Sequence, residues 1–383
     1  MANVPTGARN PALEAAIRRN RDDGSLYDVY ADWLQEHDNP IGELIAVQRQ
    51  LTDSDLPALR AREAGLLAML RPTYDPGADH PVRDQDFSAR WRWGLWDSLR
   101  IDPLSGGTNL DCEIDAEGAE RFAFAHTACA ALRELRVALH DWRWHCAASP
   151  PLLKRAAEHA WAGDLRSLVL GDDARLPGDY PETTATIGET SAAISATFPR
   201  LSQLAMYARG FGLAELALPE LETLVIATRE LAQAQLAELC ASTLPALTSL
   251  ELWIGAQREG AEITAAELAP LVAGDVFPNL TELGICNARI AHEVACTIHR
   301  SRLAPQLTRL DLSKGTLASA GAIELARHSS RFVRLQTLDV SSSFLGADAI
   351  ALLERAFTGV RVIAGDQRGD DLLLGDYLWL LGD

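Results

Sequence analysis

A six-residue phrase, Leu-x-x-Leu-x-Leu, recurs about eight times along this chain. The clearest copies are the segments 247–252, 280–285, 307–312 and 335–340, and weaker copies begin at Leu132, Leu165, Leu201 and Leu221. The last clear copies begin 27 and 28 residues apart, and steps of 26 and 33 residues precede them. Repetition at this period predicts a solenoid, in which each unit packs only on its neighbours.

The phrase and the residues between its copies have different periodicities. Leu-x-Leu is a two-residue period, which indicates a short strand with alternate side chains on opposite faces. The segments 264–273, 320–329 and 347–358 place apolar residues three or four apart, as an amphipathic helix does. Thr264 and Glu267 have the spacing of a helix capping box. We therefore predict an α/β solenoid with a parallel sheet on its concave face and helices on its convex face.

The segment 307–328, LTRLDLSKGTLASAGAIELARH, resembles the ribonuclease-inhibitor type of leucine-rich repeat. That family places Asn or Cys at the ninth position of each repeat, where the side chain holds the loop backbone. Here the ninth positions are Ala288, Gly315 and Ser343. The loops must satisfy their buried backbone groups in another way, so we expect an irregular arc.

The phrases ELWIG, ELAPLVAG, FPNLTELGICN and RLDLSKGTL lie within residues 244–325. They resemble a group of bacterial cytosolic leucine-rich-repeat proteins of unknown function, and the resemblance covers about residues 90–365. It implies a recognition or accessory protein with no assigned catalytic residues.

Residues 10–51 predict a different kind of structure from the repeats. Three short helical faces are separated by turns at Asp22-Asp23-Gly24 and 37–40. The residues Asn10-Pro11, Leu13–Ile17, Tyr30–Leu34 and Gly42–Ile45 resemble the bacterial repeat-companion domain, a small helical module that precedes repeats. Ile41 stands where that family usually has a basic residue, and the family has no established activity.

These patterns predict four segments. We expect a helical repeat-companion module at 1–70, a connector at 71–90, the repeat array at 91–365 and a cap or tail at 366–383. The segment 91–101, WRWGLWDSLRI, is predicted to be the first strand, with its tryptophans sealing the end of the array. The tail, rich in Leu and Asp, is predicted either to cap the other end or to be a peptide that another protein binds.

The charge composition of the chain indicates which classes of binding partner to expect. The chain has 383 residues, 48% of them hydrophobic, and its net charge is 35 − 53 = −18. An acidic chain lacks the basic surface that nucleic acids and anionic membranes require, so a protein partner, possibly a basic one, is expected. The first twenty residues lack a signal-peptide core, and the six cysteines form no paired framework. These observations favour the cytoplasm.

The outward-facing positions of the predicted strands identify candidate contact residues, because the two-residue period determines which side chains face the concavity. Tyr207 and Trp253 are aromatic anchors of the kind that dominate binding surfaces. The others form a mostly acidic stripe with one arginine inside it. The predicted partner-binding residues are Tyr207, Glu251, Trp253, Glu282, Arg309, Asp311 and Asp339.

Two clusters suggest other chemistry. The loop 140–146 contains His140, Trp142, Trp144 and His145, which form either a ligand site or a loop packed by its own aromatic rings. His292, Cys296 and His299 would share one helical face at a spacing that zinc can use, although packing of this face against the next helix explains them better. No segment resembles a phosphate loop or a nucleophile elbow. We expect no cofactor, no bound metal and no catalytic residues.

The leading hypothesis is therefore a non-enzymatic scaffold that binds a protein through the concave face. The alternatives are a substrate or regulated partner of an associated enzyme, cleaved or modified in a loop or in the tail, and an enzyme or metal-dependent protein that uses the loop 140–146.

Overall fold

The structure is a computed structural model that describes residues 8–70, 87–101, 123–137, 150–171, 191–208, 210–228, 230–255 and 263–368. The chain divides into two compact units. Unit 1 comprises Met1–His140, Ser149–Val169 and Thr197–Arg200. Unit 2 comprises Asp141–Ala148, Leu170–Ala196 and Leu201–Asp383. None of the described helices is both long enough and apolar enough to cross a membrane.

Unit 1 begins with four helices, α1 (Pro11–Arg19), α2 (Gly24–Glu36), α3 (Pro40–Asp53) and α4 (Pro57–Met69). The first three confirm the helical faces predicted from residues 10–51, whereas α4 was not predicted. Asn10 and Asn39 cap α1 and α3, and a proline at the first helical position follows each of them. The local sequence therefore fixes where these two helices begin.

The strands begin with a hairpin. Strand β1 (Phe87–Arg92) pairs antiparallel with β2 (Leu95–Ile101), and Trp93 and Gly94 turn the chain with φ angles of 43° and 73°. The prediction of a single strand over 91–101 was therefore wrong, because two consecutive residues with positive φ make a tight hairpin turn. Strand β1 also begins inside the range predicted as a connector, of which residues 71–86 lie outside the described residues.

The hairpin turn packs against helix α3 in unit 1. The N–H of Gly94 donates to Oε1 of Gln48 at 2.6 Å. A Cβ atom at Gly94 would lie 2.8 Å from the backbone nitrogen of Ile45, so only glycine fits here. The ring of Trp93 meets the ring of Tyr27 edge-on at 5.0 Å, and the ring of Trp96 stacks on His126 at 4.6 Å. The hairpin and the helical module thus share one core.

The rest of unit 1 continues the strand array. Strand β2 pairs parallel with β3 (Glu134–Val137). The other elements are the 3-10 turns Thr127–Ala131 and Ala162–Asp164, helix α6 (Pro150–Ala157) and strand β4 (Ser167–Leu170), whose last residue belongs to unit 2. Trp161 lies at the centre of the core of this part, fully buried between the rings of Phe124 and Phe198.

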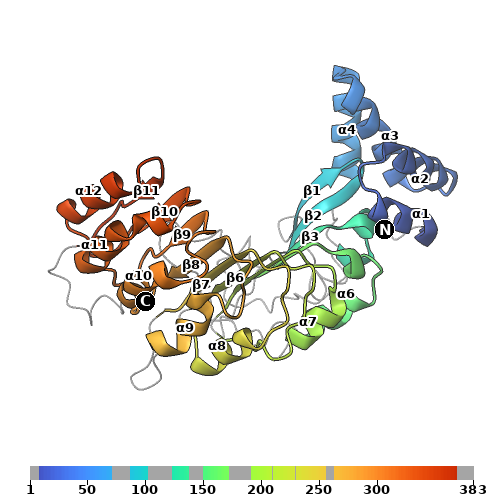
Figure 1. Cartoon of the computed structure of the whole chain (residues 1–383). Helices are drawn as coiled ribbons and strands as arrows, with labels where there is room; N and C mark the ends of the chain where they lie inside the picture. Colours follow the sequence, from blue (N-terminus) through green and yellow to red (C-terminus); the bar gives the residue numbers. More distant parts are fainter. Residues whose placement is uncertain are drawn as a thin grey trace, which may run out of the picture. The chain divides into compact units, whose positions relative to one another are not determined.

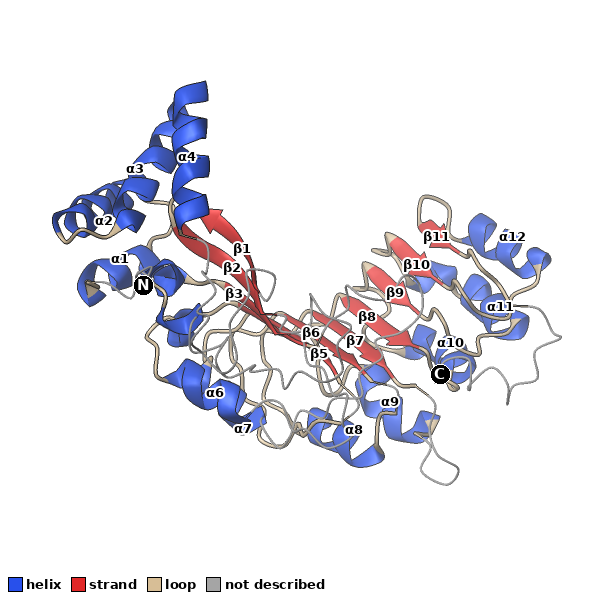
Figure 2. Cartoon of the chain, turned by 180° about the vertical axis from the view of Figure 1, so that it is seen from behind, coloured by secondary structure: helices blue, strands red, loops and turns tan. Residues whose placement is uncertain are grey.

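The described part of unit 2 contains seven parallel strands in chain order. They are β5 (Gln203–Tyr207), β6 (Thr223–Ala227), β7 (Ser249–Trp253), β8 (Glu282–Cys286), β9 (Arg309–Asp311), β10 (Thr337–Asp339) and β11 (Arg361–Ile363). The helices are α7 (Ser191–Thr197), α8 (Gln233–Cys240), α9 (Ala265–Ala273), α10 (Ala291–Thr297), α11 (Ser319–Arg327) and α12 (Ala347–Ala356). Helices α8–α12 lie along the outer side of the curved row of strands (Figures 1 and 2).

The inward leucines form continuous columns across this sheet. The register aligns Leu204, Leu224, Leu250, Leu283, Leu310, Leu338 and Val362. All but Val362 are at most 1% exposed. The predicted capping box is also confirmed, since Thr264 accepts from the N–H of Glu267 and the Glu267 carboxylate accepts from the N–H of Thr264. Strand alternation and helix capping were thus readable from the sequence.

A threonine ladder ties adjacent repeats together at the start of their strands. The hydroxyl groups of Thr248, Thr281 and Thr308 each donate to a backbone carbonyl of the preceding repeat, at 3.2, 3.3 and 3.1 Å. At the ninth positions the backbone itself makes the bond, as the N–H of Thr316 donates to the carbonyl of Ala288 at 3.1 Å. These repeats therefore use threonine side chains at the start of the strands, whereas the ribonuclease-inhibitor type uses asparagine or cysteine in the loops that follow the strands.

Candidate functional site

The face of unit 2 that lies opposite the helices carries the predicted contact residues. In β7, Leu250 and Leu252 point inward and are fully buried, whereas Glu251 and Trp253 alternate with them and are half-buried. The register places Glu251, Gly284, Asp311 and Asp339 in one row across β7–β10. Glu282 and Arg309 pair in the adjacent row, and Tyr207 lies in the row of Trp253. We call these seven predicted residues, with Gly284, the concave face.

Glu251 and Trp253 form the centre of the concave face. The indole Nε1–H of Trp253 donates to Oε1 of Glu251 at 2.6 Å. A Cβ atom on Gly284 would lie 3.0 Å from Cγ of Glu251, so the glutamate side chain lies over the glycine of the next strand. Burial raises the pKa of Glu251, and the carboxylates of Asp311 and Asp339 raise it further against the opposing effects of Trp253 and Arg309. The face thus holds a partly desolvated carboxylate beside an indole ring.

Asp311 and Asp339 hold the turns that follow their strands. Asp311 is 5% exposed. Its Oδ2 accepts from Arg309 at 2.6 Å and its Oδ1 from the N–H of Ser313 at 3.0 Å. Oδ1 of Asp339 accepts from both the N–H and the hydroxyl of Ser341, at 3.0 and 2.7 Å. Both aspartates therefore stabilise the fold as well as contribute charge to the concave face.

One residue that sequence alternation does not mark, Lys314, also belongs to this region. Nζ of Lys314 lies 5.7 Å from the ring centroid of Trp253, within reach of a cation–π interaction. Lys314 follows β9 with a φ of 60°, and Asn287 and Ser342 have φ angles of 51° two residues after Ile285 and Val340. These left-handed residues leave the two-residue alternation, so a period count cannot find them. Each of these residues lies two positions after the last residue of its repeat phrase, and this shared spacing could have identified them from the sequence.

Nucleophilic chemistry is disfavoured at Cys286, the last residue of β8. Cys286 is 1% exposed and pairs in register with Trp253. Burial raises the pKa of the Cys286 thiol well above its ordinary value, and the carboxylates of Asp311 and Glu251 add to the shift. A buried neutral thiol is unreactive.

Replacing Glu251 with glutamine is expected to stabilise the protein at neutral pH. The pKa of Glu251 is raised in the folded state. The contribution of Glu251 to the stability of the protein is therefore fully present below its ordinary pKa of 4.5, and it is lost as the pH rises through the folded-state pKa. Glu251→Gln keeps an acceptor for Trp253 and removes this loss. The melting temperature of the variant should exceed that of the wild type at pH 7, and the difference should vanish near pH 3. Glu282→Gln, on an exposed carboxylate of the adjacent strand, is the matched control. A lower melting temperature for Glu251→Gln at pH 7 would contradict the assignment.

The helical histidine–cysteine cluster does not converge on one point. Helix α10 ends at Thr297, and His299 lies in a 3-10 turn. Nε2 of His292 is 3.7 Å from Sγ of Cys296, whereas the ring of His299 stacks on His328 at 3.8 Å. Within the described residues, no group of three or more His, Cys, Asp or Glu side chains is arranged to hold a metal ion.

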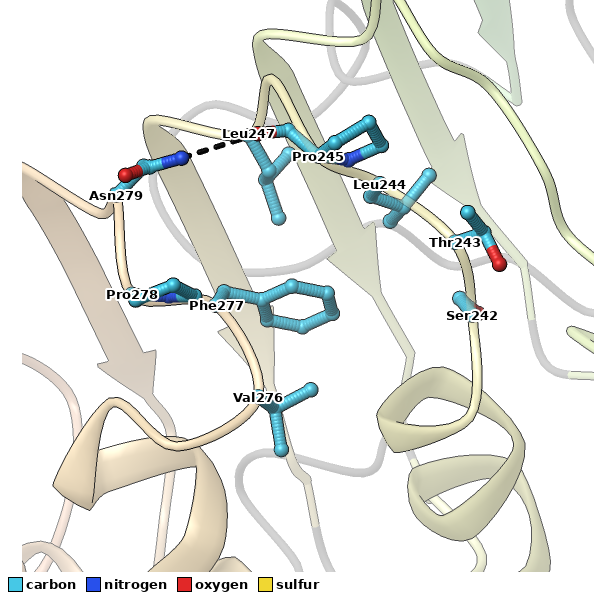
Figure 3. A pocket seen from close by; sticks show the side chains of 9 residues that line it. All are labelled: Ser242, Thr243, Leu244, Pro245, Leu247, Val276, Phe277, Pro278 and Asn279. Atoms are coloured by element: carbon cyan, nitrogen blue, oxygen red, sulfur yellow. Dashed lines mark hydrogen bonds between the residues drawn. The ribbon is translucent and has the colours of Figure 1, made fainter.

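A cleft of about 340 Å³ lies between the loops that precede β7 and β8 (Figure 3). Phe277 belongs to the loop before β8, and its ring points toward the loop before β7. Nδ2 of Asn279 donates to the carbonyl of Pro245 at 3.0 Å. The cleft falls where the repeat phrases are 33 residues apart, the longest of the four steps between the last five copies. Its lining mixes apolar side chains with those of Ser242, Thr243 and Asn279 and includes no titratable group, so it offers no acid–base chemistry. The predicted loop site at His140, Trp142, Trp144 and His145 lies outside the described residues.

Comparisons with known proteins agree with this geometry at the level of the fold. No family model and no curated protein matches the sequence. A crystal structure of a Bacteroides fragilis protein, a structural-genomics target, is 20% identical with a TM-score of 0.56, and the match covers 63% of this chain and 68% of that one.

Two further solved structures match less closely. An internalin from Listeria monocytogenes is 14% identical over 74% of this chain and 71% of its own, with a TM-score of 0.34. The APL1 leucine-rich repeat domain is 12% identical over 65% and 53%, with a TM-score of 0.28. The deciding observations are the chain-order parallel strands, the buried leucine columns and the outer helices of unit 2. The fold is a leucine-rich-repeat solenoid. Within the described residues, helices α1–α4 precede its strands.

Proposed function

We propose that this leucine-rich-repeat protein is a non-enzymatic scaffold that binds a protein partner through the concave face. The observation that carries the proposal is the half-buried pair Glu251 and Trp253 on a central strand. An indole ring that keeps part of its surface in solvent supplies a large contact area at low entropic cost. The curved sheet around it suits a partner surface better than a small molecule.

The rigidity of the sheet supports the same proposal. The inward leucines beneath the concave face are at most 1% exposed, and the threonine ladder links adjacent repeats. Side chains fixed on such strands lose little freedom when a partner binds, because most of the ordering occurs during folding.

The charges favour a basic partner. Glu251, Glu282 and Asp339 contribute negative charge, and Arg309 already pairs with Asp311 at 2.6 Å. The whole chain carries a net charge of −18. Such a surface attracts basic proteins and repels the phosphates of nucleic acids. We propose that the partner presents lysine or arginine side chains, and that the protein acts in the cytoplasm with helices α1–α4 as a repeat-companion module.

Trp253→Ala is expected to weaken partner binding roughly 30-fold or more, as the loss of a central aromatic anchor does. The partner would first be co-purified with the wild-type chain, and its dissociation constant then measured by calorimetry for each variant. Val333→Ala is the control, since Val333 is 74% exposed and lies outside the strands. Unchanged affinity in Trp253→Ala, with a melting temperature equal to that of the wild type, would refute this role of the concave face.

A further inference from the structure

Two arginines of unit 1 occupy the position that the threonine ladder uses in unit 2. Thr248, Thr281 and Thr308 are each the second residue of their repeat phrase, and Arg133 and Arg166 are the second residues of theirs. The N–H of Arg166 donates to the carbonyl of Arg133 at 2.9 Å, which is the same backbone bond that the ladder residues make. The ladder itself needs no charge. The two guanidinium side chains therefore start from adjacent repeats, where like charges repel.

A third arginine reaches this edge from the helical module. Arg21 lies two residues after the end of α1, and its Nη1 and Nη2 donate to the carbonyls of Ala131 and Leu132. Burial lowers the pKa of the Arg21 guanidinium, and the positive charge of Arg133 lowers it further against the effect of nearby acidic groups. The guanidinium groups of Arg21 and Arg133 are thus close enough to repel each other.

A fourth arginine continues the same edge. Nη1 of Arg166 donates to the carbonyl of Arg200 at 3.1 Å, and Nη1 of Arg200 donates to Oδ1 of Asp164 at 3.0 Å. All of these residues belong to unit 1. We define the basic edge as Arg21, Arg133, Arg166 and Arg200.

The nearby carboxylates do not balance the basic edge. Asp164 is shared, since it also accepts from the buried Arg18 at 2.9 Å. The carboxylate of Asp97 binds Arg90 at 2.7 Å. The side chain of Arg133 is exposed, and among the described residues it contacts no carboxylate. A positive surface therefore persists in a chain whose net charge is −18.

We propose that the basic edge binds a short acidic segment of a protein partner, whose carboxylates accept hydrogen bonds from Arg133 and Arg166. A guanidinium group donates two parallel hydrogen bonds to a carboxylate, and the bound negative charge would relieve the repulsion between neighbouring arginines. The net charge of −18 repels a long polyanion such as a nucleic acid, whereas a short segment brings few charges. This surface lies in unit 1, so the proposal does not depend on what the concave face of unit 2 binds.

Fluorescence anisotropy of a labelled peptide of ten glutamates, titrated with the full-length chain at low salt, tests the proposal. Arg133→Thr combined with Arg166→Thr introduces the residue that the threonine ladder has at this position. It should weaken binding about tenfold, because it removes two charged donors. The matched control is Arg334→Thr combined with Arg361→Thr, which removes the same charge from exposed positions of unit 2. It should weaken binding less than about twofold, since distant charges are screened.

Arg133→Thr alone keeps the test valid if the double variant does not fold. It removes an exposed side chain and should weaken binding about threefold. Failure of the wild type to bind the peptide, or equal weakening by the two double variants, would overturn the proposal. So would tighter binding of a ten-nucleotide single-stranded DNA that the substitutions at Arg133 and Arg166 abolish, because the basic edge would then recognise the phosphates of a nucleic acid.

Discussion

Trp161→Ala will lower the free energy of unfolding by about 3–5 kcal/mol, the usual effect of truncating a buried tryptophan. Trp161 is 0% exposed, and its ring lies 5.1 Å from the ring of Phe124 and 6.5 Å from that of Phe198. His159 stacks near the same ring at 6.2 Å. Removal of the indole leaves a cavity among aromatic rings that cannot collapse to fill it.

The matched control for this substitution is Trp161→Phe. The indole Nε1 of Trp161 is buried and has no hydrogen-bond partner among the described residues, so phenylalanine removes none of the hydrogen bonds seen there. We expect a loss below about 1.5 kcal/mol, since most of the ring volume remains. Urea unfolding, monitored by near-ultraviolet circular dichroism, measures the free energy of unfolding of both variants. If alanine costs less than about 1 kcal/mol, Trp161 is not the centre of this core.

Arg18→Met will destabilise unit 1 by about 2–3 kcal/mol, because it leaves buried acceptors without a charged donor. The side chain of Arg18 is 5% exposed, and its Nε donates to Oδ2 of Asp164 at 2.9 Å. Its Nη1 donates to the carbonyl of Ala130, also at 2.9 Å. One arginine of α1 thus joins two segments that lie more than a hundred residues further along the chain.

Arg19→Met is the control, since Arg19 is the next residue of the same helix and is exposed. It removes the same charge and should change stability by less than about 0.5 kcal/mol. Asp164 also accepts from Arg200 at 3.0 Å, which limits the effect of losing Arg18 alone. Equal effects of Arg18→Met and Arg19→Met in urea unfolding would show that the buried contacts contribute nothing beyond net charge.

The sequence predicted those features of the fold that depend on local periodicity. Leu250 and Leu252 alternate with Glu251 and Trp253, and this pattern placed each of them on the correct face. Thr264 and Glu267 marked the start of α9 for a similar reason, because the capping contacts span only three residues. Burial and local hydrogen bonding suffice to specify such elements.

Features that depend on unusual backbone angles were not predicted. The hairpin at Trp93 and Gly94 was missed because a tryptophan with positive φ is uncommon, and the close approach of Ile45 that requires Gly94 is a tertiary contact. The structural role of Asp311 was missed because alternation says which way a side chain points, but not that Ser313 and Arg309 occupy its oxygens. For the same reason, Lys314 was absent from the predicted contact residues.

Site-specific photocrosslinking in the native host tests the central claim most directly. A photoreactive amino acid at Glu282, exposed on β8, would be compared with one at Val333, which is exposed outside the strands. We expect one discrete protein adduct from position 282, weakened by high salt because surface charges are screened, and none from position 333. An adduct that forms equally from both positions, or only from position 333, would contradict recognition through the concave face.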